Sequence, residues 1–252
     1  MSVHDTRIFA RMAAGGVQYV IYQMDLNAKE DLAMVLPIPV NPIEGRDTMK
    51  FINFEAYPTF FDDMRKPFDE DAPRAAADPF ADLTLDSKPK LQVHRVGSYD
   101  ASFVPDPSQF NRLDERFRLP AKTFETYKEY EHYGFAVFKL RAGDARVHPM
   151  AFAFRSGEPG MLFFPTVHVH DGEMHERESF DHELYLQGGF PGAMTRLGDD
   201  NQRAQTWTES SKIPTRFMKL HKTKGLVLPD KHVFRLTLRG EFLNRDVFVK
   251  VA

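Results

Sequence analysis

The chain has 252 residues, of which 42% are hydrophobic and 13% aromatic, and this content excludes an intrinsically disordered protein. Its 33 Lys and Arg residues nearly balance 36 Asp and Glu residues, and the net charge of −3 argues against a protein drawn as a whole to nucleic acid or an anionic membrane. The absence of cysteine excludes disulfide bonds, a thiolate nucleophile and Cys-ligated metal centres.

The first 26 residues give no sign of a targeting or membrane segment. Arg7 and Arg11 precede only a short apolar run, which Gln23 and Asp25 interrupt. No stretch approaches the ~18 consecutive apolar residues that cross a bilayer. Because a chain without cysteine also suits a reducing compartment, we expect a soluble cytoplasmic protein with no membrane contact.

The N-terminal part, residues 1–65, is predicted to form a β-rich lobe. Two β-rich runs, residues 17–26 and 31–40, are joined by a short polar stretch, and this spacing predicts a β-hairpin. Prolines near the end of the second run predict that it leaves the sheet or lies on its edge, because proline donates no ladder hydrogen bond. A helical turn is predicted around residues 59–64, with Thr59 as its capping residue.

Residues 66–90 are rich in proline, alanine and acidic residues and show no apolar period, which predicts a linker or long loop between two lobes. After it, Asp106, Pro107 and Gln109 stand at the N-cap, first and capping-box positions of a predicted helix. A second short helix is predicted over residues 124–133.

A series of strands separated by Gly, Asp or Pro predicts an antiparallel meander over residues 135–143, 148–157, 160–172 and 180–189. It belongs to a predicted C-terminal lobe, residues 91–190, and residues 191–252 form an extension that packs back on the lobes. The predicted fold class is therefore α+β, mainly antiparallel β, with two packed β-rich lobes and a few short helices.

The order of strands around LPIPVNP (36–42), with VQYVIYQMDL before it and FINFEAYPTFFDDMRKPF after it, resembles the bacterial domain of unknown function numbered 2330. The resemblance covers about residues 16–190. It implies a bacterial protein with two related β lobes, and it implies no activity and no catalytic residue. It also implies export and cysteines near the N-terminus, and this chain contains no cysteine.

The histidine-rich stretch 163–187 carries the most specific chemistry. Asp171-Gly172 is a dipeptide favoured in two-residue type I′ hairpin turns, and such a turn places His168 opposite His175 and His170 opposite Glu173. Because side chains alternate between the faces of a strand, all four then lie on one face.

Three imidazoles and one carboxylate at cross-strand distance suit a divalent Zn, Fe, Mn, Ni or Cu ion. We therefore predict a metal site formed by His168, His170, His175 and Glu173, with hydrolytic or oxygenase-like chemistry at an open coordination position. Two alternatives stay open: the four residues form only the wet face of a hairpin, or they form a pH-sensitive or substrate-binding cluster.

The functional prediction therefore has two branches. One is a metal-binding protein whose substrate the sequence does not specify. The other is a non-enzymatic protein-binding or assembly module, whose partner is another protein or a second copy of the chain. A basic island at residues 212–224 suits phosphate contacts, but we expect it to be a solvated helix or loop, because no nucleic-acid module surrounds it.

Overall fold

β-strands dominate the computed structural model of this protein. The described residues are 2–28, 32–40, 49–69, 93–97, 99–113, 128–140, 143–158, 160–167, 175–189, 191–196 and 206–251. Within these ranges there is one short α-helix and several 3-10 turns, which confirms the predicted β-rich class with few short helices. No helix in them combines the length and the apolar character that crossing a membrane requires.

The largest sheet has eight strands in the order β13-β14-β11-β1-β2-β9-β4, with β8 pairing beside β9 on β2. Its pairs are antiparallel except for β1 and β11, which run parallel. The strands are β1 Ser2–Met12, β2 Val17–Ala28, β4 Met49–Asn53, β8 Gly143–Arg146, β9 Met150–Arg155, β11 Arg177–Gln187, β13 Thr208–Glu209 and β14 Val233–Leu243.

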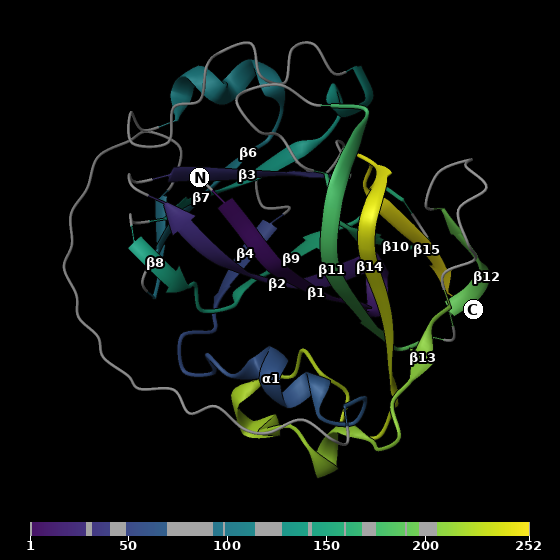
Figure 1. The fold of residues 1–252 in the computed structure, drawn as a ribbon. Helices are drawn as coiled ribbons and strands as arrows, with labels where there is room; N and C mark the ends of the chain where they lie inside the picture. The colour runs from purple at the N-terminus through teal and green to yellow at the C-terminus, as the bar shows by residue number, and fades with distance from the viewer. Residues whose placement is uncertain are drawn as a thin grey trace.

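Two smaller sheets lie on one side of the large sheet (Figure 1). The four-stranded sheet, in the order β3-β7-β6-β5, consists of β3 Leu32–Ile38, β5 Val93–Val96, β6 Tyr99–Val104 and β7 Gly134–Leu140. The three-stranded sheet, in the order β10-β15-β12, consists of β10 Met161–Phe164, β12 Pro191–Arg196 and β15 Val247–Val251. Together they cover one face of the large sheet.

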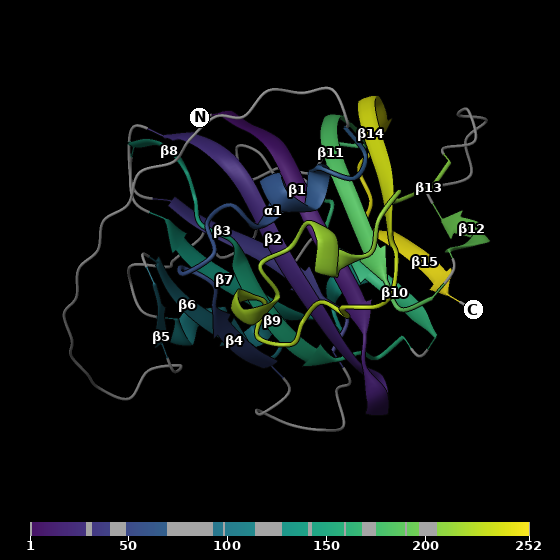
Figure 2. The ribbon, with the colours of Figure 1, turned by 90° about the horizontal axis from the view of Figure 1, so that it is seen from below.

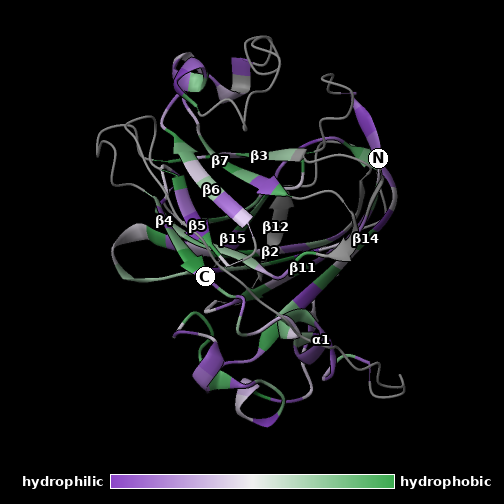
Figure 3. Ribbon diagram, turned by 90° about the vertical axis from the view of Figure 1, so that its left-hand side faces the viewer, coloured by the Kyte–Doolittle hydropathy of each residue, from purple (hydrophilic) through white to green (hydrophobic). Residues whose placement is uncertain are grey.

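The helices of the described residues are all short. The α-helix is α1 Phe60–Arg65, and the 3-10 helices are η1 Ala14–Gly16, η3 Pro107–Arg112, η5 Lys128–Tyr130, η6 Pro214–Arg216 and η7 Leu220–Lys222. Viewed from the side, α1 lies across the large sheet from the four-stranded sheet (Figure 3). The large sheet is therefore the middle layer.

The central strands are buried on both faces. Along β1, Ile8 and Ala10 point into the core beneath the two smaller sheets, whereas Arg7, Phe9 and Arg11 point toward α1. Strands β2 and β11 alternate in the same way, and all three have one apolar face and one face that mixes aromatic with polar side chains.

The strand β1 was not predicted. Residues 7–12 read RIFARM, a short apolar run with an arginine on either side of it, and two arginines on one face of a strand suggest a surface. In the structure Arg7 is only 1% exposed. A charged residue is rarely buried so deeply unless it has partners, and Arg7 is paired with Asp5 on the same strand and with the distant Asp62.

The strands predicted within residues 17–40 exist, but the predicted hairpin between them was wrong. β2 pairs with β1, β9 and β8, whereas β3 pairs with β7 in another sheet. The predicted meander was wrong for the same reason, since β7, β9, β10 and β11 each pair with strands outside that series. Loop spacing indicates which strands can pair locally, but burial of apolar faces decides which strands do.

The predicted division into lobes at residues 66–90 is not tested as such and stays a prediction. Strands from the two sides of that segment nevertheless share sheets: β1 pairs with β11, β2 and β4 with β9, and β3 with β7. The N-terminal and C-terminal parts of the chain are therefore interleaved.

The predicted helix start at Asp106 is confirmed. Its carboxylate accepts a hydrogen bond from the Ser108 backbone N–H at 3.0 Å, and it also accepts one from the Gln109 side chain. The turn is a 3-10 helix that ends at Arg112, not an α-helix. Residues 114–127, with the rest of this prediction and the first part of the second predicted helix, lie outside the described residues.

Gly97, between β5 and β6, is predicted to tolerate no side chain. Its φ is +67°, and a Cβ would lie 2.5 Å from His148 Nε2 and 2.9 Å from Glu55 Cβ. We expect Gly97→Ala to lower the free energy of unfolding, measured with urea, by about 2–3 kcal/mol through backbone strain and this clash. Gly160→Ala is the control: φ is +79° with nothing within 4 Å, so strain alone applies, about 1 kcal/mol. Equal losses would contradict the clash.

Candidate functional site

The helix α1 packs on the mixed face of the large sheet, in front of β1 and β2 (Figure 2). Phe60, Phe61 and Met64 are fully buried there, and the Phe61 ring lies 5.9 Å from the ring of Tyr185 on β11. Apolar residues in adjacent positions and at i+4 make a helix with one buried face. The helix directly precedes residues 70–92, which lie outside the described residues.

The predicted capping role of Thr59 was wrong. Thr59 stands at the N-cap position, but its side chain makes no cap hydrogen bond to the helix. Its hydroxyl accepts instead from the Lys219 ammonium at 3.3 Å. The side chain therefore links α1 to the segment after β13.

An ion pair fixes the C-terminal end of α1 to the sheet. Arg65 donates to both carboxylate oxygens of Glu183 on β11, with Nη2 2.7 Å from Oε1 and Nε 3.1 Å from Oε2. The hydroxyl of Tyr185 donates to Glu183 Oε2 at 2.7 Å. The Glu183 side chain is 6% exposed, so its charge is largely removed from water and depends on these donors.

Asp69, which follows α1, makes a second pair of contacts. Asp69, the last described residue before the gap, lies 3.6 Å from Arg65 Nε. Arg235 on β14 donates to Asp69 Oδ1 at 2.8 Å, and its guanidinium stacks over the Phe68 ring. Asp69 is therefore held on the sheet by two arginines.

Arg7 extends this network under the helix. It is opposite Glu183 in the register of β1 and β11, and it forms ion pairs with Asp5 and with Asp62 on α1, the latter at 3.9 Å. A buried guanidinium must be matched by acceptors, and here carboxylates flank it on the strand and on the helix. We call Asp5, Arg7, Asp62, Arg65, Asp69, Glu183 and Arg235 the ionic base.

Burial, hydrogen bonds and neighbouring charges shift the pKa values of Glu183 and of Tyr185 beside it. Burial on its own raises the pKa of Glu183, but the hydrogen bonds from Arg65 and Tyr185 prevail and bring it below the ordinary value of 4.5. Burial and the neighbouring carboxylate of Glu183 raise the pKa of Tyr185 well above 10. At neutral pH Glu183 is therefore ionised, while Tyr185 keeps its proton and donates it.

Most of the predicted metal site lies outside the described residues. His168, His170 and Glu173 belong to that part, while His175 is described and is exposed just before β11. The flanking strands β10 and β11 lie in different sheets, so the predicted pairing does not continue into them. Among the residues that the structure describes, no three His, Asp or Glu side chains gather to hold a metal ion. The site at His168, His170, His175 and Glu173 stays a prediction.

Sequence reasoning missed the ionic base. Two local signals were available: Asp62 and Arg65 stand at i and i+3, and Arg65 and Asp69 at i and i+4, which favours ion pairs along a helix. Neither signal points to Glu183, which is 118 residues from Arg65 in the sequence.

No protein-family model matches the chain, and no curated protein matches it. Solved structures do match in fold. The chain is similar to the crystal structure of baculovirus P35, with a TM-score of 0.52 and 12% identity over 99% of this chain and 97% of that one. It is also similar to a mutated baculovirus P35 after caspase cleavage, with a TM-score of 0.50 and 13% identity over 98% of this chain and 100% of that one.

These similarities define the class of fold: a P35-like β-rich architecture over nearly the whole chain. At 12–13% identity they establish the fold alone. The resemblance to the domain of unknown function numbered 2330 is neither supported nor opposed by them.

The ionic base makes a testable prediction. Arg65→Met leaves the buried Glu183 carboxylate without its bidentate cation, and we expect the free energy of unfolding at pH 7 to fall by about 3 kcal/mol. Adding Glu183→Gln to this variant should recover part of the loss, because a neutral amide needs no cation. Arg239→Met, at an exposed arginine of β14, is the control and should cost under about 0.5 kcal/mol.

The same measurement has a pH dependence. Because the folded-state pKa of Glu183 is lowered, its stabilising contribution is complete above pH 4.5 and is lost as pH falls through the lowered value. The difference between wild type and Arg65→Met should therefore shrink under acid conditions. An undiminished difference at pH 3 would show that lost packing, not the ion pair, causes the effect.

Proposed function

We propose that this protein is a substrate-like ligand of a caspase, a cysteine protease that cleaves after aspartate, and that the protease acts between α1 and β5. The observation that carries the proposal is the shared fold with P35, one solved form of which is described as the protein after caspase cleavage. This proposal belongs to the protein-binding branch of the functional prediction. The encounter would occur in the cytoplasm, since a catalytic thiol must stay reduced.

We place the cleaved bond by asking which aspartates already form ion pairs or hydrogen bonds. In the described part, Asp5, Asp62, Asp63 and Asp69 form ion pairs around α1, and Asp106 caps η3. A protease needs a peptide it can take in extended form, most simply as an added strand. The composition of residues 66–90 already predicts a linker or long loop, and this stretch carries several further aspartates.

Within that stretch, residues 82–86 (DLTLD) alternate leucine with acidic or hydroxyl residues, which is the period of an extended strand. Asp86 precedes Ser87, a small residue, whereas Asp82 precedes the bulky Leu83 and Asp78 precedes a proline. We therefore propose Asp86-Ser87 as the cleaved bond.

The chemistry at that bond belongs to the protease. Its thiolate adds to the carbonyl carbon of Asp86, the bond to the Ser87 nitrogen breaks, and that nitrogen leaves as a protonated amine. Water then hydrolyses the thioester and returns the thiol. The chain contributes a positioned peptide and no thiol of its own, because it contains no cysteine.

The fold favours retention of both products. A cut at residue 86 would divide the chain between strands that pair with each other: β1 with β11, β2 and β4 with β9, and β3 with β7. The two fragments would then remain joined by these four strand pairings within sheets. The ionic base adds the Arg65–Glu183 and Arg235–Asp69 pairs across the same division.

Incubation with a panel of purified caspases tests the proposal. We expect cleavage after Asp86, seen by mass spectrometry as a new N-terminus at Ser87, and co-elution of both fragments from a size-exclusion column. Asp86→Ala should abolish this cut, while Asp78→Ala, in the same stretch but before proline, should leave it intact. Resistance to every caspase without any inhibition of them, or cleavage unaffected by Asp86→Ala, rejects the proposal in this form.

Metal binding is the second candidate function, and the turn signal Asp171-Gly172 between His170 and Glu173 favours it. We propose that Zn, Fe, Mn, Ni or Cu would be held by His168, His170, His175 and Glu173. Elemental analysis of untagged protein should find about one metal ion per chain, lost in a His168→Ala, His175→Ala double variant. His132→Ala, at an exposed histidine elsewhere, is the control. Metal-free native protein without micromolar affinity excludes the site.

A further inference from the structure

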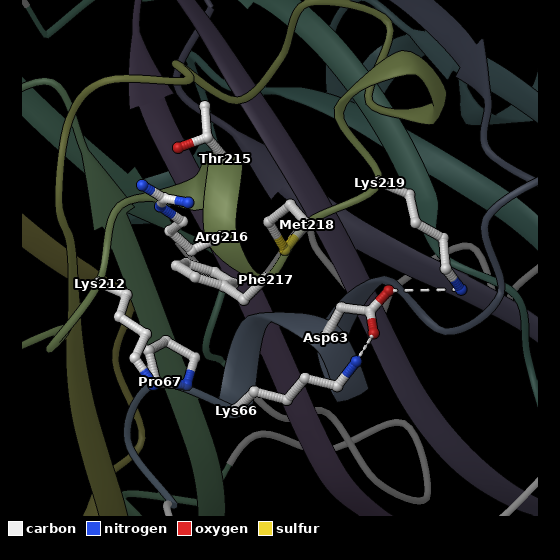
Figure 4. Close-up of a pocket in the computed structure, with 9 residues that line it drawn as sticks. All are labelled: Asp63, Lys66, Pro67, Lys212, Thr215, Arg216, Phe217, Met218 and Lys219. Atoms are coloured by element: carbon white, nitrogen blue, oxygen red, sulfur yellow. Dashed lines mark hydrogen bonds and ion pairs between the residues drawn. The ribbon is translucent and has the colours of Figure 1, made fainter.

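Part of the basic island at residues 212–224, which forms loops and two 3-10 turns, lines a pocket against α1. The pocket has a volume of about 390 Å³ and opens between the end of α1 and residues 212–219 (Figure 4). Lys66 comes from the residue after the helix, while Lys212, Arg216 and Lys219 come from the island. Four cations from two segments that are far apart in sequence therefore face one cavity.

The backbone that carries these cations is fixed. Tyr57 Oη accepts a hydrogen bond from the Lys219 backbone N–H at 2.9 Å, and the Ser211 hydroxyl donates to the Pro67 carbonyl at 2.8 Å. Met218 is buried in the same core as Phe60. The backbone positions that carry the cations are therefore set before a ligand arrives, which reduces the entropy lost on binding.

One carboxylate in the pocket offsets part of this charge. Asp63, whose side chain is 5% exposed, pairs with Lys66 and lies 3.6 Å from the Lys219 ammonium, and it accepts a hydrogen bond from Tyr57 Oη at 2.8 Å. Four cations against one carboxylate leave an excess of three positive charges around the cavity. In a protein with a net charge of −3, this is a local reversal of sign.

The other residues that line the pocket indicate which class of ligand it suits. Pro67, Phe217 and Met218 provide apolar surface beside the cations, and the Thr215 hydroxyl lies next to Arg216 (Figure 4). A guanidinium and ammonium groups around a hydroxyl suit phosphate oxygens, which accept several charged hydrogen bonds at once. The apolar surface suits an organic body attached to the phosphate.

We propose that this pocket binds a phosphate monoester with an apolar body, through Lys212, Thr215 and Arg216, with Lys66 and Lys219 shared between the ligand and Asp63. The volume lies within the range of small-molecule sites. A peptide carboxylate brings a single charge, whereas a phosphate monoester brings nearly two and so matches the excess better. The proposal is independent of the caspase proposal and goes beyond it.

Calorimetric titration with phenyl phosphate and with inorganic phosphate, at matched ionic strength, tests the site. We expect one phenyl phosphate per chain, and weaker binding of inorganic phosphate because it lacks the apolar body. A Lys212→Gln, Arg216→Gln double variant should lower the affinity for phenyl phosphate about 100-fold, since each lost charged hydrogen bond accounts for about tenfold. Both side chains are exposed, so the unliganded variant should unfold at the wild-type temperature.

A Lys222→Gln, Lys231→Gln double variant is the matched control, because it removes the same charge outside the pocket. It should lower the affinity less than about threefold, by screening alone. An equal loss in this control, or no saturable binding of phenyl phosphate to the native protein, overturns the site. Asp86→Ala should bind phenyl phosphate as the wild type does, whatever its effect on cleavage.

Discussion

An ionised carboxylate that is buried in a β-sheet is stable only beside a cation. Glu183 on β11 is such a carboxylate, and the packing on the mixed face of the large sheet depends on its partners. Arg65 on α1 supplies a bidentate partner, and Arg7 on β1 stands opposite in the register. The burial of Phe60 and Phe61 provides non-directional free energy, but two forked hydrogen bonds fix the position of the helix on the sheet. Residues 66–69, which follow α1, therefore begin at a fixed position on the sheet.

Different segments pack on the two faces of the large sheet, and a buried glutamine amide links the sheet to the segment on each face. On the apolar face, Gln18 pairs with the Phe163 backbone through both its amide groups, tying β2 to the three-stranded sheet. On the mixed face, Gln187 does the same with Leu228 and also donates to the Lys231 carbonyl. Because each side-chain amide both donates and accepts a hydrogen bond, it specifies one alignment of the two layers that it joins. The interleaved strands then allow the proposed cut without separation of the halves.

Helix α1 and the residue after it contribute charged side chains to both the ionic base and the basic pocket. Asp62 and Arg65 belong to the ionic base beside the sheet, whereas Asp63 and Lys66, one position later, line the basic pocket. Adjacent pairs at i and i+3 follow different sides of a helix. The proposed caspase cleavage and the proposed phosphate binding can thus be altered separately by substitution.

The sequence by itself determined where strands form, because alternation is a local property: β2, β3, β7, β9, β10 and β11 all fall in stretches predicted as strands. It also determined the start of η3 at Asp106, where the capping groups are neighbours in the chain. Only the tertiary structure decided which strands pair, that Arg7 is buried, and that Lys66 meets Arg216 in one pocket. Those outcomes depend on burial of apolar faces and neutralisation of charge between residues such as Arg65 and Glu183, 118 positions apart, and no local pattern encodes contacts at that range.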